Sequence, residues 1–386
     1  MNTNKYYSGN KAMKQTDPKL IMLEHSEAKV NLYGTYLSIY LNILSRVPTV
    51  YKIFIFDLFC GEGIYEGGGK GSPMIALDAI KNHYYSNNNT CPNITVWFND
   101  NGESEMEPGI PKVDRVQRLC KSLFVPTNVS LEFKIYDYDT ILPHALNIIR
   151  TTQRAKGLFF LDPYGYKDIK LDDIRKILQG GSTEVIWFLP ISLMYRFAVK
   201  ALESSFSGSE PLHAFLVDLF GNTHPTFNSV HDFIFQIKEG FRVELSSQSI
   251  FVDTFTIERE SRNVYCLFFF TSSIKGFEKM LEAKWKVDTN RGKGFTLEKT
   301  MSFLNEIELS GYPDKLCRFI LSARYRSNVD LYHFGLENGF LPKHTNEVLK
   351  TWKDRGELEV FSLDGKPVRG YYLSDSKRSI GIIFKS

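Results

Sequence analysis

Residues 51–79 constrain the fold more than any other stretch of the chain. The apolar run at 51–56 is rich in β-forming residues and predicts one strand. It is followed by Asp57-Leu58-Phe59-Cys60-Gly61-Glu62-Gly63, by a second glycine cluster, and by Ser72-Pro73, which suits a helix start. Strand, glycine turn and helix in this order are typical of sheets that bind nucleotides or cofactors, because glycine lets backbone approach a ligand closely.

The same alternation of strand and helix repeats as far as residue 189. Further strands are expected at 94–98, 129–136, 157–161 and 184–189, and helices at 25–46, 111–123, 141–150 and 171–179. This order predicts an α/β fold with a doubly wound parallel sheet. A closing hairpin is expected from 251–257 and 264–271, followed by a helix at 277–284, and the helices at 212–220 and 233–241 read as an insertion over about 200–250.

Acidic residues stand at the ends of four predicted strands. They are Asp57, Asp100, Asp137 and Asp162. Ligands of doubly wound sheets bind at the carboxyl ends of the strands, so we expect these carboxylates to share one edge. An acidic residue after the second strand accepts hydrogen bonds from ribose hydroxyls in such sheets, which makes Asp100 the candidate and Glu103 the fallback. Alternatively, Asp100 only shapes a turn, since Asn-Asp-Asn-Gly is also good turn chemistry.

The segment Asp162-Pro163-Tyr164-Gly165 follows a wholly apolar strand. An exocyclic amino group of a nucleobase is a poor nucleophile, because its lone pair is delocalised into the ring. Methylating it requires acceptors for the N–H hydrogens and a flat surface that fixes the base. Asp162 and the Pro163 carbonyl can accept, and Tyr164 can stack on the base. The alternative is an ordinary turn at a strand end.

Motif and composition checks exclude several other classes. Lys70 is followed by Gly71 rather than by Ser or Thr, so the glycine cluster is not a kinase-type phosphate loop. The five cysteines are scattered without a Cys-x-x-Cys pair, which argues against a zinc site and a disulfide framework and favours a cytoplasmic location. The polar N-terminus and the lack of a long apolar run predict neither a signal peptide nor a membrane span.

The chain from about residue 310 predicts a second domain. Helices at 314–323, 330–338 and 343–352, then a hairpin of 357–361 and 368–373, follow the order of a winged helix. The part from residue 315 onward holds 13 Lys and Arg against 8 Asp and Glu, although the whole chain has a net charge of only +3. The side chains available to nucleic acid are Lys343, His344, Asn346, Lys350 and Lys353 on the third helix, with Lys366 and Arg369 on the wing. A winged helix that docks a protein is the alternative.

Three motifs resemble those of the three-Cys-motif partner proteins, TcmP. They are Asp-Leu-Phe-Cys-Gly-Glu-Gly at 57–63, Gly-Ser-Pro at 71–73 and Leu-Asp-Pro-Tyr-Gly at 161–165. The His25-x-x-x-Lys29 helix and the strand and helix at 265–280 are similar as well, so the resemblance covers roughly residues 25–300. That family is similar to class I S-adenosylmethionine-dependent methyltransferases, and its name implies a radical-S-adenosylmethionine-like partner with three cysteines.

The resemblance implies S-adenosylmethionine as cofactor and assigns roles to individual residues. Asp57, Gly61 and Gly63 would hold its methionine part, beside Phe59, with Asp100 at the ribose and Asp137 near the adenine. Asp162, Pro163 and Tyr164 would hold the target amine. A single proline precedes Tyr164, whereas adenine-N6 and cytosine-N4 methyltransferases usually have two. Asp-Pro-aromatic-Gly is closer to the tRNA N2-guanine dimethyltransferases, so the base stays open.

These inferences combine into one expected organisation. A helical extension at 1–50 precedes a Rossmann-like methyltransferase domain at 51–300, and a winged-helix-like domain covers 310–386. The expected function is methylation of an exocyclic amino group of a nucleobase in RNA or DNA, without a metal. Two alternatives stay open: a cofactor-binding partner of the radical enzyme without methyl transfer of its own, and a nucleic-acid-binding winged-helix module.

Overall fold

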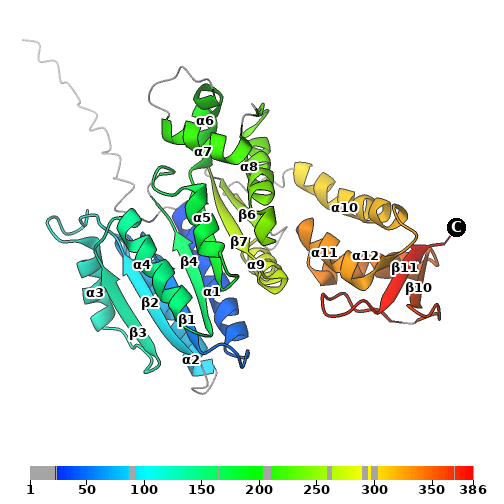
Figure 1. Cartoon of the computed structure of the whole chain (residues 1–386), viewed down its shortest axis with the longest axis horizontal. Coiled ribbons are helices and arrows are strands. Elements are labelled where there is room, and N and C mark those ends of the chain that lie inside the picture. The colour runs from blue at the N-terminus through cyan, green and yellow to red at the C-terminus, as the bar shows by residue number, and fades with distance from the viewer. Residues whose placement is uncertain are drawn as a thin grey trace, which may run out of the picture.

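A computed structural model describes residues 22, 24–86, 92–163, 165–202, 210–221, 223, 225–258, 263–288, 294–296, 303–368 and 370–385. Its main element is an eight-stranded sheet with the strand order β3-β2-β1-β4-β5-β7-β6-β8 (Figure 1). The strands are β1 Lys52–Asp57, β2 Asn93–Asn99, β3 Val129–Lys134, β4 Ala155–Leu161, β5 Thr183–Leu189, β6 Phe251–Glu258, β7 Val264–Thr271 and β8 Gly294–Thr296.

The first five strands are parallel, which confirms the doubly wound sheet that the alternation predicts. β1 pairs with both β2 and β4, so the strand order reverses between β1 and β4. β7 runs antiparallel between β5 and β6 and forms the predicted hairpin with β6. Ligands of open α/β sheets bind beside such a reversal point, at the carboxyl ends of the strands.

Helices cover both faces of the sheet. One face packs against α1 Glu24–Leu44, α2 Ser72–Ser86, α3 Lys112–Lys121 and α9 Ile274–Val287. The other face packs against α4 Tyr138–Thr151, α5 Leu171–Leu178, α6 Ile191–Leu202, α7 Glu210–Phe220 and α8 Val230–Glu244. Side chains along β1 alternate between the two cores: Phe54 and Phe56 enter one, and Ile53 and Ile55 enter the other. Burial on both faces explains why the central strands are continuous apolar runs.

The helices between β5 and β6 differ from the sequence-based expectation. They form part of the core on one face, where Phe215 of α7 and Phe241 of α8 pack edge-on or tilted against Trp187 of β5. They are therefore more than an insertion over the sheet edge. The sequence pattern does not predict helix α6, and the short turn η1 Ser246–Gln248 follows α8.

The C-terminal unit contains three helices and a three-stranded antiparallel sheet. Its elements are α10 Phe303–Leu321, β9 Arg326–Ser327, α11 Asn328–Glu337, α12 Pro342–Asp354, β10 Leu358–Ser362 and β11 Ile380–Phe384, with the strand order β10-β11-β9. The expected second hairpin strand at 368–373 is wrong, because β10 pairs with Ile380–Phe384 instead. Near this segment, Phe361 and Pro367 form an isolated antiparallel β-bridge, and the Val368 N–H donates to the Val360 carbonyl. Pro367 has no N–H for a ladder, which limits the pairing here.

Helix α9 joins the C-terminal unit to the sheet. Phe277 and Leu281 of α9 belong to the apolar core of the C-terminal unit, and the Trp285 indole donates to the Gly339 carbonyl at 3.1 Å. The Tyr332 hydroxyl donates to the Glu278 carboxylate. No helix in the described ranges is both long and apolar enough to cross a membrane.

Candidate active site

The loop after β1 folds tightly and ends at the start of α2. Gly61 and Gly63 have φ values of 64° and 77°, in the left-handed region that favours glycine. The Gly71 N–H donates to the Gly63 carbonyl at 2.7 Å, and a Cβ on Gly71 would lie 3.1 Å from that oxygen. A Cβ on Gly61 would meet no described atom within 4 Å, so its left-handed conformation rather than local crowding requires glycine there. The loop therefore holds its backbone in a fixed curve at the reversal point.

Asp57 is fully buried at the end of β1. Neither carboxylate oxygen has a donor at full hydrogen-bond geometry among the described residues, although the Ser72 hydroxyl and the Phe59 N–H lie near enough to lower its pKa. The pKa of Asp57 is raised to about 8, chiefly by burial. The negative charges of Asp162 and Asp100 also raise it, and the nearby Ser72 partly offsets these effects. A buried carboxyl group whose nearby donors do not reach full hydrogen-bond geometry is costly in a folded protein, so a cationic ligand group is the kind of partner that would complete its contacts.

Asp162 lies beside Asp57, one strand away. Phe160, two residues before Asp162, is in register with Asp57. The Asp162 Oδ2 atom forms an ion pair with the ammonium of Lys29 from α1, and the Asp162 side chain is 20% exposed. The Lys29 ammonium also lies 4.5 Å from the centre of the Phe188 ring on β5. The two carboxylates that the sequence predicts to be functional thus share one edge, with a cation from the N-terminal helix next to one of them.

Asp100 holds two loops together. Its Oδ2 atom accepts from the Gly61 N–H at 3.0 Å, and its Oδ1 atom accepts from the Gly102 N–H at 2.8 Å. The Lys112 ammonium lies 3.8 Å from Oδ1, and both side chains are buried. This geometry matches the turn-shaping alternative and also fixes the glycine loop, while contact with a ribose stays a prediction. The fallback, Glu103, is exposed.

The remaining predicted cofactor residues lie at the same edge. Asp137 is exposed at the start of α4 and accepts a hydrogen bond from the Asn101 amide. The Phe59 ring stacks on Tyr138 with 5.4 Å between ring centres. Pro163 is buried, and Tyr164 lies outside the described residues.

Two groups of supporting side chains escape the sequence-based prediction. The first is Asn99, buried at the end of β2, where its amide nitrogen donates to the carbonyls of Leu58 and Tyr136 and its oxygen accepts from the Tyr136 N–H. It ties the ends of β1 and β3 to β2. The one sequence signal for Asn99 is that a polar residue ends an apolar strand.

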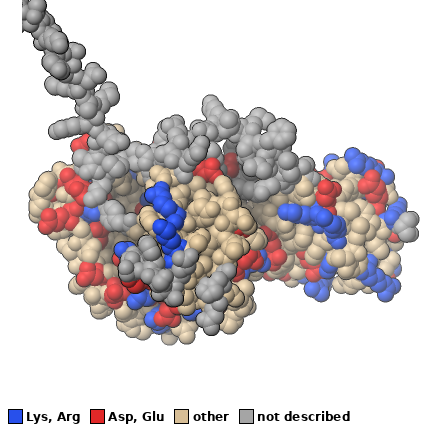
Figure 2. All heavy atoms as spheres, turned by 90° about the horizontal axis from the view of Figure 1, so that it is seen from above, with Lys and Arg blue, Asp and Glu red and all other residues tan. Residues whose placement is uncertain are grey.

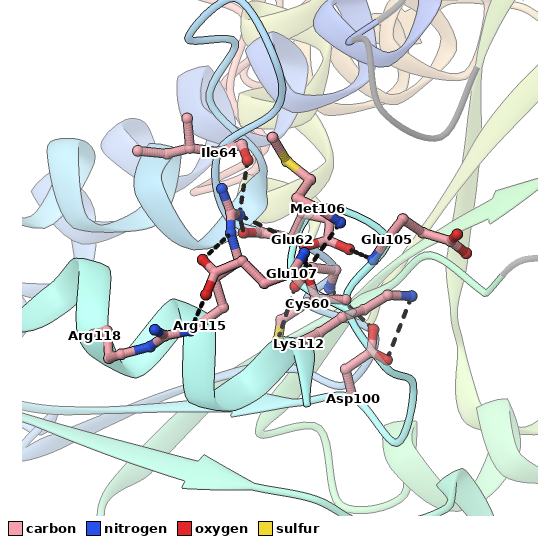
Figure 3. A network of polar contacts seen from close by, with 12 residues as sticks. Cys60, Glu62, Ile64, Asp100, Glu105, Met106, Glu107, Lys112, Arg115 and Arg118 are labelled. Atoms are coloured by element: carbon pink, nitrogen blue, oxygen red, sulfur yellow. Dashed lines mark hydrogen bonds and ion pairs between the residues drawn. The ribbon is translucent and has the colours of Figure 1, made fainter. Parts of the chain in front are cut away.

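The second group is a network around Glu62, which Figure 3 shows. The buried Glu62 carboxylate accepts from the Ser104 hydroxyl at 2.8 Å and the Glu105 N–H at 2.7 Å. Arg115 of α3 donates to the carbonyls of Glu62 and Ile64 and pairs with Glu107 at 3.2 Å. The network fastens the glycine loop to the loop after β2, and no sequence spacing points to Arg115.

The predicted nucleic-acid residues of the C-terminal unit have different surroundings. Lys343 and Lys350 are exposed on α12, whereas Lys353 is half-buried with its ammonium 5.5 Å from the Tyr371 ring centre. His344 lies 4.3 Å from Trp285 between ring centres, and its Nδ1 atom accepts from the Leu341 N–H, so this ring belongs to the junction with α9. Burial lowers the pKa of His344.

The wing of the C-terminal unit carries less of the predicted set. Lys366 is exposed and pairs with Asp364 at 3.3 Å, and Arg369 lies outside the described residues. Figure 2 shows several groups of Lys and Arg side chains on the C-terminal unit, on the right of the view. The basic excess of this unit is therefore at its surface.

One surface hollow of about 550 Å³ lies away from the carboxyl ends of the strands. It is lined by α1, the segment that follows α1, and α9, and it contains none of the predicted site residues. Within the described residues, no group of three His, Cys, Asp or Glu side chains could hold a metal ion.

Comparison with known proteins gives no family. No family model and no curated protein matches the chain, so the resemblance to the TcmP proteins stays an expectation. Among solved structures, 17 chains match. Trm1 from Pyrococcus horikoshii in complex with S-adenosyl-L-methionine is 11% identical over 97% of this chain and 94% of that chain, with a TM-score of 0.35.

Two further solved structures are similarly distant. MNMC2 from Aquifex aeolicus is 12% identical over 60% of this chain and 56% of that chain, with a TM-score of 0.29. A putative O-methyltransferase from Klebsiella pneumoniae is 11% identical over 67% of this chain and 92% of that chain, with a TM-score of 0.30. Likenesses with such low TM-scores do not identify a substrate.

Proposed function

We propose that this protein is an S-adenosylmethionine-dependent methyltransferase that acts on an exocyclic amino group of a nucleobase in RNA or DNA. One observation carries the proposal. A buried Asp57 carboxyl group, which no described donor meets at full hydrogen-bond geometry, and a partly exposed Asp162 carboxylate lie at the ends of adjacent parallel strands, beside a left-handed glycine loop. This is the edge at which doubly wound sheets bind their ligands.

The residues at this edge fit the proposed cofactor. Asp57 offers a negative charge, once ionised, to the cationic methionine part, and the Gly61–Gly63 backbone can approach the ligand without a glycine Cβ in the way. Asp137, exposed beyond the end of β3, is the candidate near the adenine. When bound, the cofactor supplies a methyl group on a sulfonium sulfur, which retains the bonding electron pair as the methyl group leaves.

Asp162 would act on the amino group that receives the methyl group. As that nitrogen pyramidalises, its N–H hydrogens need acceptors, and the Asp162 carboxylate with the Pro163 carbonyl would supply them. The nitrogen gains a C–N bond and a positive charge, and then loses one proton to the carboxylate or to water. Tyr164 would stack on the base and hold it for in-line transfer.

The C-terminal unit supports nucleic acid as the substrate. Its element order, α10-β9-α11-α12-β10-β11, is consistent with the proposed winged helix, and Lys343 and Lys350 are exposed on the third helix, α12. We assign phosphate contact to these two lysines, with Lys353, Lys366 and Arg369 as further candidates. His344 has its ring against Trp285 and is the least suited member of the predicted set.

The test is transfer of a labelled methyl group from S-adenosylmethionine to total RNA and to genomic DNA, followed by nucleoside analysis. Wild-type protein should label the amino group of one nucleoside, and Asp162→Ala should lose at least about 100-fold of that rate while its affinity for S-adenosylhomocysteine changes less than about twofold. Cofactor binding without transfer to either polymer would overturn the enzymatic proposal and favour a cofactor-binding partner of a radical-S-adenosylmethionine-like protein. A transfer rate that survives Asp162→Ala would remove Asp162 from the mechanism.

A further inference from the structure

The N-terminal helix α1 reaches the proposed active-site edge. Its Tyr33 ring stacks on Phe160 of β4 with 4.2 Å between ring centres. Nearly one turn further on, the Tyr36 ring lies 5.0 Å from Phe269 of β7 and its hydroxyl donates to the buried Glu184 carboxylate of β5. These contacts anchor α1 on three strands of the sheet. The helix is thus part of the core rather than an extension in front of it.

Lys29 stands on the same face of α1, one turn before Tyr33. Its side chain is 11% exposed, and its ammonium pairs with Asp162 Oδ2 across 133 residues of sequence. The Phe188 ring, 4.5 Å from the ammonium, is itself stacked on Tyr265 with 5.3 Å between ring centres. A buried ammonium is costly unless it is paired. The position of α1 on the sheet therefore places the Lys29 ammonium against the Asp162 carboxylate.

The ion pair with Lys29 gives the two carboxylate oxygens of Asp162 different surroundings. Oδ2 is held by Lys29, whereas Oδ1 accepts no hydrogen bond from a described residue. A carboxylate rotates freely about its terminal torsion unless one oxygen is fixed. With Oδ2 fixed, Oδ1 has a defined direction and is left for a donor that is not part of the described chain.

We propose that Lys29 is a positioning residue of the active site, which fixes the Asp162 carboxylate so that Oδ1 accepts the N–H of the substrate amine. This inference rests on the proposed function and adds α1 to its machinery. It predicts that loss of the ammonium affects turnover more than binding, because the acceptor is still present but no longer held in the productive direction.

The experiment compares Lys29→Met, which keeps most of the apolar stem, with Lys29→Arg, which keeps the charge. Lys29→Met should lower kcat by about 10- to 100-fold with KM changed less than about threefold, and Lys29→Arg should restore at least about a third of the loss on a logarithmic scale. The control is Lys156→Met, whose ammonium contacts the Gly181 carbonyl beside the opposite ends of the strands. It should leave kcat unchanged.

A double-mutant cycle separates positioning from folding. In an Asp162→Asn background, Lys29→Met should lower kcat by less than about twofold, because the carboxylate it orients is gone. This double variant removes both charges together, so it can be compared with Asp162→Asn even if Lys29→Met alone fails to fold, and a loss of more than about tenfold in kcat in that comparison would overturn the proposal. Equal losses in both backgrounds would overturn the proposal.

Crystal structures provide a readout that does not depend on turnover. The Asp162 side chain of Lys29→Met should change rotamer or become spread over several, while α1 stays on the sheet. An Asp162 side chain that keeps its position would overturn the positioning role. If the wild-type protein transfers no methyl group, the proposed function fails, and this comparison still decides whether Lys29 orients Asp162.

Discussion

Asp57 makes the stability of this protein depend on pH in an unusual direction. Its pKa is raised from 3.8 to about 8, chiefly by burial, so the folded state holds this proton more tightly than the unfolded state does. Between these two pH values, therefore, the contribution of Asp57 to the free energy of unfolding falls as pH rises. It stays constant above about pH 8.

Asp57→Asn should remove this part of the pH dependence. The amide has the same shape and cannot ionise, so the variant should melt at a higher temperature than the wild type at about pH 9 and within about 2 °C of it at about pH 5, without cofactor. Thermal unfolding followed by circular dichroism across this range is the measurement. A wild-type protein that gains stability relative to Asp57→Asn as pH rises would show that the folded state favours the ionised Asp57 carboxylate, contrary to this prediction.

Asn99 is the residue on which the strand ends depend. Its side chain makes three hydrogen bonds to backbone groups of Leu58 and Tyr136. Asn99→Ala would remove all three, including the buried one to the Leu58 carbonyl. We expect a loss of about 1–3 kcal/mol in the free energy of unfolding, measured with urea. Asn93→Ala at the exposed start of the same strand is the control and should cost less than about 0.5 kcal/mol.

At the scale of elements, most strands and helices of the sheet are readable from the sequence. The central strands are apolar because both faces are buried, and Gly61, Ser72 and Pro73 mark the turn and the helix after β1. The pattern fails where context decides. The segment 368–373 has strand-forming tyrosines, yet Tyr372 is 76% exposed and β11 forms further on. Strand β8, with three residues, is too short for any periodicity.

The active-site edge is readable only in part. Acidic residues at strand ends are predictable because every parallel strand brings its carboxyl end to the same edge. The Lys29–Asp162 pair is not, since it depends on how α1 lies across the sheet. A lysine in the first turns of an amphipathic helix is usually solvated, whereas Lys29 is buried.

Helix α9 has a glycine that its neighbours require. A Cβ on Gly276 would lie 2.2 Å from Glu184 Oε1 and 2.9 Å from the Thr271 hydroxyl, two groups that are hydrogen-bonded to each other. Gly276→Ala should therefore destabilise the protein by about 1–3 kcal/mol despite the better helix propensity of alanine.

Gly311 in α10 is the matched control for that substitution. A Cβ there would meet no described atom within 4 Å. Gly311→Ala should raise the free energy of unfolding by up to about 1 kcal/mol, measured in the same urea titration. If both alanine variants stabilise the protein, the close approach between α9 and β5 is wrong.

At the scale of the whole molecule, one helix belongs to two cores. Met280 and Ala283 of α9 pack on the sheet, and Phe277 and Leu281 pack in the C-terminal unit. The hydrogen bonds from Trp285 to Gly339 and from Tyr332 to Glu278 fix the orientation of the C-terminal unit against α9, which apolar contacts alone leave less defined. A substrate that contacts both α12 and the edge of the sheet would need these two surfaces at a constant separation, and α9 is the element that sets it.

Trp285→Ala tests whether this junction holds the two parts together. The substitution removes the donor to Gly339 and the ring against His344, at a cost of roughly 3 kcal/mol. Small-angle X-ray scattering should then show a broader distribution of interatomic distances, and methyl transfer to long nucleic acid should show a higher KM with an unchanged affinity for S-adenosylhomocysteine.

The control is Trp352→Ala, since Trp352 packs on Phe384 inside the C-terminal unit. If Trp352→Ala broadens the distribution as much as Trp285→Ala does, the effect is loss of the unit's own fold. An unchanged distribution in Trp285→Ala would mean that the apolar contacts of Phe277 and Leu281 fix the junction without it.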